Sequence, residues 1–379
     1  MSLVDARGVP SKLSDVEFWR MVTGFSEPGG YFPANNFVSN EMEYQSVLPA
    51  LLTTVKPGGV YLGVGPDQNF TYISALQPRM AFIVDIRRQN MLQHLMFKAL
   101  IEMAPTRGDF LSRLFGRPRP PGLDDAATPR ALLEAFAGAP ASLALFEETN
   151  RRALDLLERQ HGFALSPDDT DAIRYVLGTF HEYGPEITYA PIDMSRPPGF
   201  GPTVRVSMFP SFRELVNQGD PTGTNRGYLA TEDSYRVLRD LQRRNLIVPI
   251  VGDFAGDKAL SAVGGYVRER GAVVTSIYVS NVEQYLFQNN VWRLYYDNVA
   301  ALPTDRTSTF IRAFFPFGGM IRTNPAILSR SPESADPINL YLYPVSSTLV
   351  SPVSAILTAL AEGRVSSYLD VIELSASGR

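Results

Sequence analysis

Short apolar runs of strand type alternate with stretches of helical periodicity along most of the chain. The run VYLGV at 60–64 follows the turn residues at 57–59 and ends in the glycine turn at 63–66. Helical spacing follows at 69–76, and a second buried run, AFIVDI, occupies 81–86. Strand, glycine turn, helix and strand within about 30 residues predict a βαβ unit with a right-handed crossover.

The second half of the chain returns to the same alternation after a long helical stretch. The segment LIVPIVGDF at 246–254 is predicted as a strand, with a bulge or irregularity at Pro249. A helix at 258–271 and a strand at 272–281 follow it. The later β-like runs TSTFIRAFF, NLYLYPV and SYLDVIEL lack clear intervening helices. We therefore expect an α/β fold of Rossmann-like, methyltransferase type, whose mostly parallel sheet has an antiparallel edge.

Four segments follow from these patterns. We expect residues 1–55 to form N-terminal helices and a lid loop, 56–105 to form the first βαβ unit that binds a cofactor, 106–202 to form a helical insertion, and 203–379 to complete the sheet. Ser14 or Asp15 is expected to cap the first helix, and Ser39 or Asn40 the second. The aromatic and polar loop at 27–41, together with Tyr44, is a candidate lid over the cofactor.

Composition excludes several classes of chemistry. There are no cysteines, which rules out disulfides, thiolate zinc sites, iron–sulfur clusters and cysteine nucleophiles. Hydrophobic residues make up 45% and charged residues 20%, as in ordinary globular proteins. No signal-peptide pattern and no long apolar run occurs, so no membrane contact and a cytoplasmic location are expected.

The net charge of −4 argues against general nucleic-acid binding, which needs a basic surface. One local basic stretch is predicted to be a solvated helix end followed by a proline-rich loop, and its members are Arg107, Arg113, Arg117 and Arg119.

The glycine turn and the end of the second strand carry the candidate cofactor chemistry. Gly63 and Gly65 would let a ligand approach the backbone closely. Asp85, about 20 residues after Gly63, would accept hydrogen bonds from ribose hydroxyls. The alternative is a structural turn, with Asp85 only capping the following helix. Asp67 would repel a pyrophosphate, which favours a cationic ligand such as S-adenosylmethionine. Arg87 and Arg88 could instead hold a 2′-phosphate, but Asp85 beside them disfavours NADP.

The segments VYLGVGPDQNFTYI and AFIVDIRRQN resemble motif one and the acidic end of the second strand in class I S-adenosylmethionine-dependent methyltransferases. The chain resembles more closely an uncharacterised bacterial family of methyltransferase-like proteins, one member of which comes from Leptospira, and the likeness includes PGGYFPANNFVSNE and VSNVEQYL. The resemblance implies a seven-stranded sheet with an antiparallel last strand, and it places Asp253 and Phe254 at the end of the fourth strand, facing the cleft. It implies no particular reaction. Tyr61 stands where most methyltransferases have an acidic residue, and Asp67 replaces a third glycine.

Together these arguments give one set of expected cofactor contacts. They are Gly63, Val64, Gly65, Asp67, Asn69, Asp85, Ile86, Arg87, Asp253 and Phe254.

The catalytic candidates are His181, Tyr278 and Glu283. His181 ends a helix, where a structural role is the common alternative. Tyr278 and Glu283 flank the end of the predicted fifth strand, where a substrate pocket would be lined, but Glu283 also fits a capping box with Ser280. His94 is expected to be packed and His161 to be solvated, and their spacing carries no metal signature.

Three functions remain open on the sequence alone. The leading hypothesis is a methyltransferase that uses S-adenosylmethionine and acts on a small molecule. The alternatives are an NAD-dependent oxidoreductase built on the same βαβ unit, and a non-catalytic methyltransferase-like module whose helical insertion binds a protein partner. No motif of serine hydrolases, P-loop proteins, zinc proteases or kinases is present.

Overall fold

A six-stranded sheet forms the centre of the chain in the computed structural model, which describes residues 8–189, 209–315 and 346–377. The strand order is β3-β2-β1-β4-β5-β6. The first five strands are parallel, and β6 runs antiparallel to β5. The strands are β1 Val60–Gly63, β2 Met80–Asp85, β3 Ile247–Val251, β4 Val274–Ser280, β5 Thr309–Phe314 and β6 Ser347–Pro352. The predicted α/β class and the antiparallel edge are confirmed.

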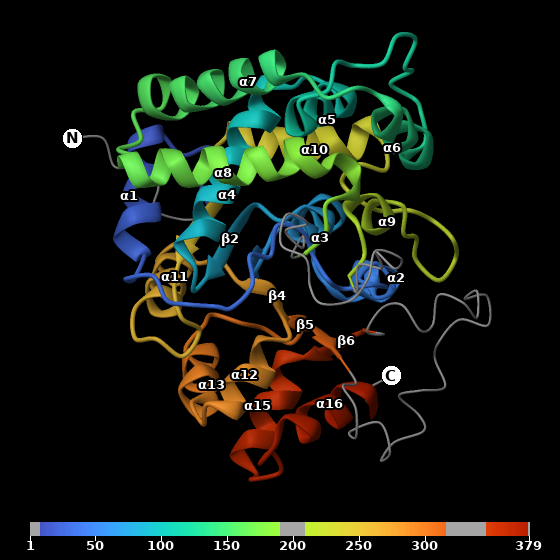
Figure 1. Cartoon of the computed structure of the whole chain (residues 1–379). Coiled ribbons are helices and arrows are strands. Elements are labelled where there is room, and N and C mark those ends of the chain that lie inside the picture. Colours follow the sequence, from blue (N-terminus) through green and yellow to red (C-terminus); the bar gives the residue numbers. More distant parts are fainter. Residues whose placement is uncertain (1–7, 190–208, 316–345, 378–379) are drawn as a thin grey trace, which may run out of the picture.

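Helices cover the sheet on two sides. In Figure 1, α4, α5, α7, α8 and α10 lie above the sheet, and α11, α12, α13, α15 and α16 lie below it. The helices of the first half are α1 Asp15–Phe25, α2 Leu48–Thr54, α3 Gln68–Leu76, α4 Arg88–Met103, α5 Arg107–Phe115, α6 Pro129–Gly138, α7 Leu143–Asp155 and α8 Pro167–Tyr183. Those of the second half are α9 Phe212–Val216, α10 Glu232–Arg243, α11 Ala259–Glu269, α12 Val282–Gln288, α13 Trp292–Ala300, α15 Val353–Ala361 and α16 Tyr368–Ser377. Helices α5 to α8 make up the predicted helical insertion between β2 and β3.

Burial explains why these runs form the strands of the interior. Every residue of β1, β2, β3 and β5 is buried, as expected where helices pack on both faces of a parallel sheet. The chain passes from β1 through β2 to the edge strand β3, then returns to place β4 on the other side of β1. The strand order therefore reverses between β1 and β4, the point where open α/β sheets bind their ligands.

Three local expectations about the strands are wrong. Pro249 causes no bulge, because β3 pairs with β2 in continuous register and lies at the sheet edge, where a missing N–H is tolerated. The segments 246–254 and 272–281 contain the third and fourth strands rather than the fourth and fifth. The run SYLDVIEL belongs to α16, whose buried residues Tyr368, Val371, Ile372 and Ser375 follow helical spacing.

The sheet has six strands in the described part of the chain, not the seven that the resemblance implies. The run NLYLYPV at 339–345 lies outside the described residues.

The two N-terminal helices differ in how they begin. Ser14 caps α1 in a capping box with Glu17, which confirms one of the two expected caps. Helix α2 starts after Val47 without a side-chain cap, so neither Ser39 nor Asn40 caps it.

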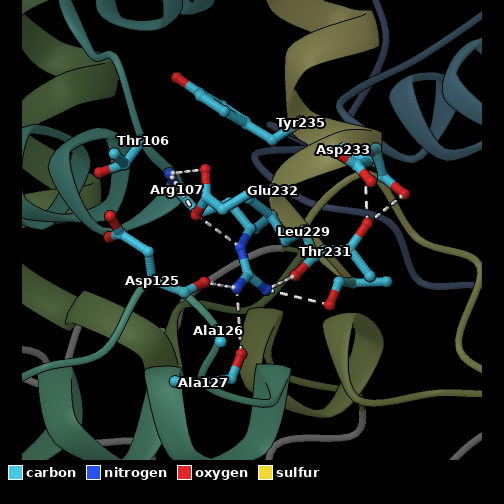
Figure 2. A network of polar contacts seen from close by, with 12 residues as sticks. Thr106, Arg107, Asp125, Ala126, Ala127, Leu229, Thr231, Glu232, Asp233 and Tyr235 are labelled. Carbon is cyan, nitrogen blue, oxygen red and sulfur yellow. Dashed lines mark hydrogen bonds and ion pairs between the residues drawn. The ribbon is translucent and has the colours of Figure 1, made fainter.

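Arg107 joins the helical insertion to α10 through a buried polar network (Figure 2). Its Nε donates to Glu232 at 2.9 Å, and its Nη1 donates to the carbonyls of Leu229 and Ala230 at 2.8 and 3.0 Å. Its Nη2 donates to the carbonyls of Asp125 and Ala127 at 2.5 and 3.0 Å. One guanidinium thus satisfies acceptors from two separate chain segments.

The basic stretch around Arg107 is therefore not a solvated helix end. Arg117 donates to the carbonyls of Phe136 and Ala139 at 2.8 and 3.0 Å. Arg119 pairs with Asp125 at 2.5 Å. Arg107, Arg117 and Arg119 thus hold the insertion together through hydrogen bonds and ion pairs.

Replacing Arg107 by Met is expected to lower the free energy of unfolding by roughly 3–5 kcal/mol, because the partly buried carboxylate of Glu232 and four backbone carbonyls lose their donor. Urea denaturation measures this. Arg236→Met is the matched control, since Arg236 forms an exposed ion pair with Asp233 on the same α10 and should cost about 1 kcal/mol or less. Equal losses in the two variants would contradict a structural role for the network.

Candidate functional site

A cavity of about 370 Å³ lies at the carboxyl ends of β1, β2, β3 and β4. This volume falls within the usual range for small-molecule sites. Each strand is followed by residues that line the cavity: Gly65 and Pro66 after β1, Asp85 and Ile86 at the end of β2, Asp253 and Phe254 after β3, and Tyr278 and Ser280 at the end of β4. The N-terminal segment closes another side with Tyr31, Phe32, Asn36, Ser39 and Glu41. Tyr44 of the proposed lid is buried elsewhere, where its hydroxyl donates to Leu215.

The glycine turn after β1 is braced from behind by Asn69. The amide nitrogen of Asn69 donates to the carbonyls of Val64 and Pro66 at 2.8 and 2.7 Å, and its oxygen accepts from the Tyr61 hydroxyl at 2.8 Å. A Cβ added at Gly63 would lie 2.0 Å from that oxygen. Gly63 is therefore required by packing, and neither Gly63 nor Asn69 lines the cavity, whereas Val64 and Gly65 do.

His94 fixes the same turn from α4. Its Nε2 lies 2.8 Å from the carbonyl oxygen of Gly65, and desolvation lowers the pKa of the ring to about 4. The imidazole is thus neutral at pH 7, so Nε2 carries the proton and donates to Gly65. The expectation of a packed histidine is confirmed.

Asp67 turns away from the cavity. Its carboxylate accepts a hydrogen bond from Tyr228 at 2.9 Å, and burial raises its pKa to about 6. Asp67 does not line the cavity, so its charge does not face a ligand there. The argument that Asp67 repels a pyrophosphate is therefore not supported by its position.

Asp85 and Arg87 form a buried ion pair on the cavity wall. Arg87 donates from Nε to Oδ1 at 3.0 Å and from Nη2 to Oδ2 at 2.9 Å. The backbone N–H of Arg87 also donates to Oδ1, at 2.9 Å. Arg87 further donates to the carbonyl of Asn35 at 2.6 Å, which ties the loop of the N-terminal segment to the end of β2. Helix α4 has no side-chain cap, so Asp85 is not simply a helix cap. Oδ2 accepts one hydrogen bond and keeps a lone pair for a ligand hydroxyl.

The end of β3 supplies both a polar and an apolar wall. Asp253 accepts from the backbone N–H of Ala255 at 2.9 Å, which shapes the turn after the strand. Phe254 is buried and stacks on Tyr295, with ring centroids 5.8 Å apart. Both residues line the cavity, as the sequence predicted for the end of this strand.

Glu41 is the buried acid of the cavity, and sequence reasoning did not select it. It is 1% exposed. Its Oε1 accepts from the hydroxyl of Tyr278 at 2.6 Å and from that of Ser280. Its Oε2 has no hydrogen-bond partner among the described residues. Desolvation raises the pKa of this carboxyl above its usual value. Tyr278 and Glu41 are 237 positions apart, so no local spacing signals the contact.

Of the three catalytic candidates, the structure brings only Tyr278 to the cavity. His181 stacks on Phe146 with ring centroids 4.9 Å apart, and its Nδ1 lies 3.2 Å from the carbonyl of Phe115 in the helical insertion. Glu283 is buried in an ion pair with Arg312, at 2.7 Å, away from the cavity lining.

The capping box predicted at Ser280 and Glu283 is wrong. Helix α12 follows Asn281 without a side-chain cap, and the Ser280 hydroxyl faces Glu41 instead. His161 is also less exposed than expected, because its two ring nitrogens lie 2.8 and 3.0 Å from carboxylate oxygens of Asp15 and Glu102.

Two features are absent from residues 8–189, 209–315 and 346–377. These residues contain no cluster of three or more histidine and acidic side chains that could hold a metal ion. Within the same ranges, no helix combines the length and apolar character needed to cross a bilayer.

The raised pKa of Asp67 predicts a pH-dependent stability. The native state keeps a proton that the unfolded chain releases, so the free energy of unfolding should fall by about 3 kcal/mol as pH rises from about 4 through about 6. Asp67→Asn keeps an acceptor for Tyr228 and should remove this contribution. Urea denaturation of both proteins across pH 4–8 isolates it as a difference, with the exposed Asp171→Asn on α8 as control. If the free energies of unfolding of wild type and Asp67→Asn differ by the same amount at every pH, the prediction is refuted.

Strands β1 to β5 and the cavity lining from Asn36 onward fall within one family model. The model for the domain of unknown function DUF7790 matches residues 36–119 and 126–323. A search of the curated proteins finds no match. Since the matched residues make up more than half of the sequence, the chain belongs to the DUF7790 family.

Proposed function

We propose that the cavity binds S-adenosylmethionine and that the protein transfers its methyl group to a small molecule. The observation that carries the proposal is the charge of the lining. Three carboxylates, Glu41, Asp85 and Asp253, line the cavity, and Arg87 is the one lysine or arginine among the described lining residues. Arg87 is already paired with Asp85. Such a wall favours a ligand with positive charge, and S-adenosylmethionine carries a sulfonium and an ammonium group.

The position of each wall suggests how the ligand lies. The ribose hydroxyls would donate to Oδ2 of Asp85, at the end of β2. The adenine ring would pack on the apolar side chains of Ile86 and Phe254, with its exocyclic amine directed to Asp253. The remaining end of the ligand would then lie against the glycine turn at Gly65, where the backbone is exposed.

Methyl transfer makes few demands on the protein beyond positioning. The acceptor's lone pair attacks the methyl carbon, the carbon–sulfur bond breaks, and its electron pair stays on sulfur as a neutral thioether. The positive charge passes to the acceptor atom, which then releases its proton to solvent water. Holding the two reactants in line contributes roughly 7–11 kcal/mol to such a reaction. A cavity with few charged side chains in its lining suits this role.

Dinucleotides fit the lining less well. Arg87 is occupied by Asp85 and by the carbonyl of Asn35. Arg88 pairs with Asp169 at 2.7 Å. Neither arginine therefore has a free pair of guanidinium N–H donors for a 2′-phosphate. The carboxylates of Glu41 and Asp253 would also repel a phosphate group.

Thermal unfolding with S-adenosylhomocysteine, S-adenosylmethionine, NAD and NADP tests the proposal. S-adenosylhomocysteine at about 100 times its dissociation constant should stabilise the protein by roughly 2.7 kcal/mol, a rise in Tm of about 3–4 °C. Asp85→Asn should weaken this binding by about tenfold or more, since a hydrogen bond to a charged acceptor is lost.

Asp171→Asn, which removes one exposed carboxylate outside the cavity, should bind like wild type. A response to NAD alone would replace the methyltransferase proposal with the oxidoreductase. No response to any nucleoside, or a response that Asp85→Asn leaves intact, would overturn the site.

A further inference from the structure

One buried oxygen in the cavity wall has no hydrogen-bond partner. Oε1 of Glu41 receives the hydroxyls of Tyr278 and Ser280, and the Gln68 amide lies close enough to lower the pKa of Glu41 but donates to the Tyr278 hydroxyl, so Oε2 has no donor among the described residues. A buried carboxylate oxygen without a donor is costly, and native proteins usually satisfy such groups. Because Glu41 lines the cavity, a ligand there can supply the missing donor.

We propose that Glu41 binds a protonated primary amine in this cavity. Where that amine belongs to the nucleoside ligand, the assignment rests on the proposed function. A charged N–H donor forms the strongest hydrogen bond to a carboxylate, and an ammonium group carries three such donors. No ion pair of Glu41 occurs in the described part of the chain, so a bound ammonium group would be the first opposite charge to reach this carboxyl and would favour its ionised form.

The backbone is irregular at the end of β4, where Tyr278 and Ser280 contact Glu41. The register between β4 and β5 shifts between Tyr278 and Ser280, which marks a bulge at the end of β4. Ser280 has φ of +50°, a left-handed conformation that is unusual for a residue with a side chain. The bulge brings the two hydroxyls onto the same oxygen of Glu41. Backbone strain of this kind at a cavity wall is typical of binding and catalytic sites.

The amine has two possible sources. Gln68, the first residue of α3 after the glycine turn, donates to the Tyr278 hydroxyl and so lies within the Glu41 cluster. The cluster is therefore at the turn, where the aminoacyl tail of S-adenosylmethionine would end. The other source is a separate amine substrate that occupies the same point.

Three probes distinguish the two sources of the amine from each other and from the absence of an amine site. S-adenosylhomocysteine carries the aminoacyl tail, 5′-methylthioadenosine is a related nucleoside thioether without it, and n-propylamine is an amine without a nucleoside. Calorimetry measures the nucleosides, and NMR titration measures the amine. The variant is Glu41→Gln, which keeps the shape and an acceptor for Tyr278. Glu41→Met is a second variant in case the first is unstable. Glu269→Gln, an exposed residue on α11, is the control for charge.

The expected result is that Glu41→Gln weakens S-adenosylhomocysteine at least tenfold and leaves 5′-methylthioadenosine unchanged, which assigns the amine to the tail. Loss of n-propylamine binding alone, with both nucleosides unchanged, also supports the site and assigns it to a separate substrate. If wild type binds no nucleoside but binds n-propylamine through Glu41, the proposed function fails while the amine site stands. Wild-type behaviour of every bound probe in Glu41→Gln and Glu41→Met, or no binding of any probe, would overturn the inference.

Discussion

The reversal of strand order between β1 and β4 is the constraint on which the rest of the structure depends. Because the parallel strands β3, β2, β1 and β4 end at one edge, their following loops must share the same space. Helices that follow strands on opposite sides of the switch diverge, and a cavity remains between them. The N-terminal segment fills only part of that space, and the remaining volume is about 370 Å³. Acidic side chains at the ends of two of these strands, Asp85 at β2 and Asp253 after β3, and Glu41 on the N-terminal segment then decide which ligands the cavity accepts.

Burial of ionisable groups is the physical cost of this arrangement. His94 is held neutral so that it can support the carbonyl of Gly65, and Asp67 is shielded behind Tyr228. Asp85 is neutralised by Arg87, but Glu41 has no opposite charge in the described residues. Packing around the glycine turn explains the burial of His94 and Asp67, and the ion pair with Arg87 explains that of Asp85. No such partner explains the burial of Glu41. A buried carboxyl group that the fold does not compensate is best explained by a ligand.

The parts of this structure that sequence could predict are those determined within a few tens of residues. The βαβ unit, the glycine turn and the position of Asp85 follow from apolar runs, turn residues and one spacing. Asn69 was expected to contact the cofactor, but its side chain supports the backbone of the turn from behind and does not line the cavity.

The errors have a common origin in long-range contacts. Glu283 looked like a helix cap or a base because its partner Arg312, on the neighbouring strand β5, could not be recognised from spacing. The last apolar run looked like a strand, yet its buried residues fit a helix that packs beside β6. Glu41 could not be found at all, since both of its partners come from β4 near the other end of the chain. Local patterns thus predicted the wall of the cavity formed by the glycine turn and Asp85, and tertiary packing determined the wall formed by Glu41 and β4.

The most direct test of the cavity as a nucleoside site is an experimental structure of the protein crystallised with S-adenosylhomocysteine. We expect the ribose hydroxyls within hydrogen-bond distance of Asp85, the adenine against Phe254 and the tail at the glycine turn. Ligand bound elsewhere on the protein, or a cavity that stays empty at saturating ligand concentration, would contradict the central claim.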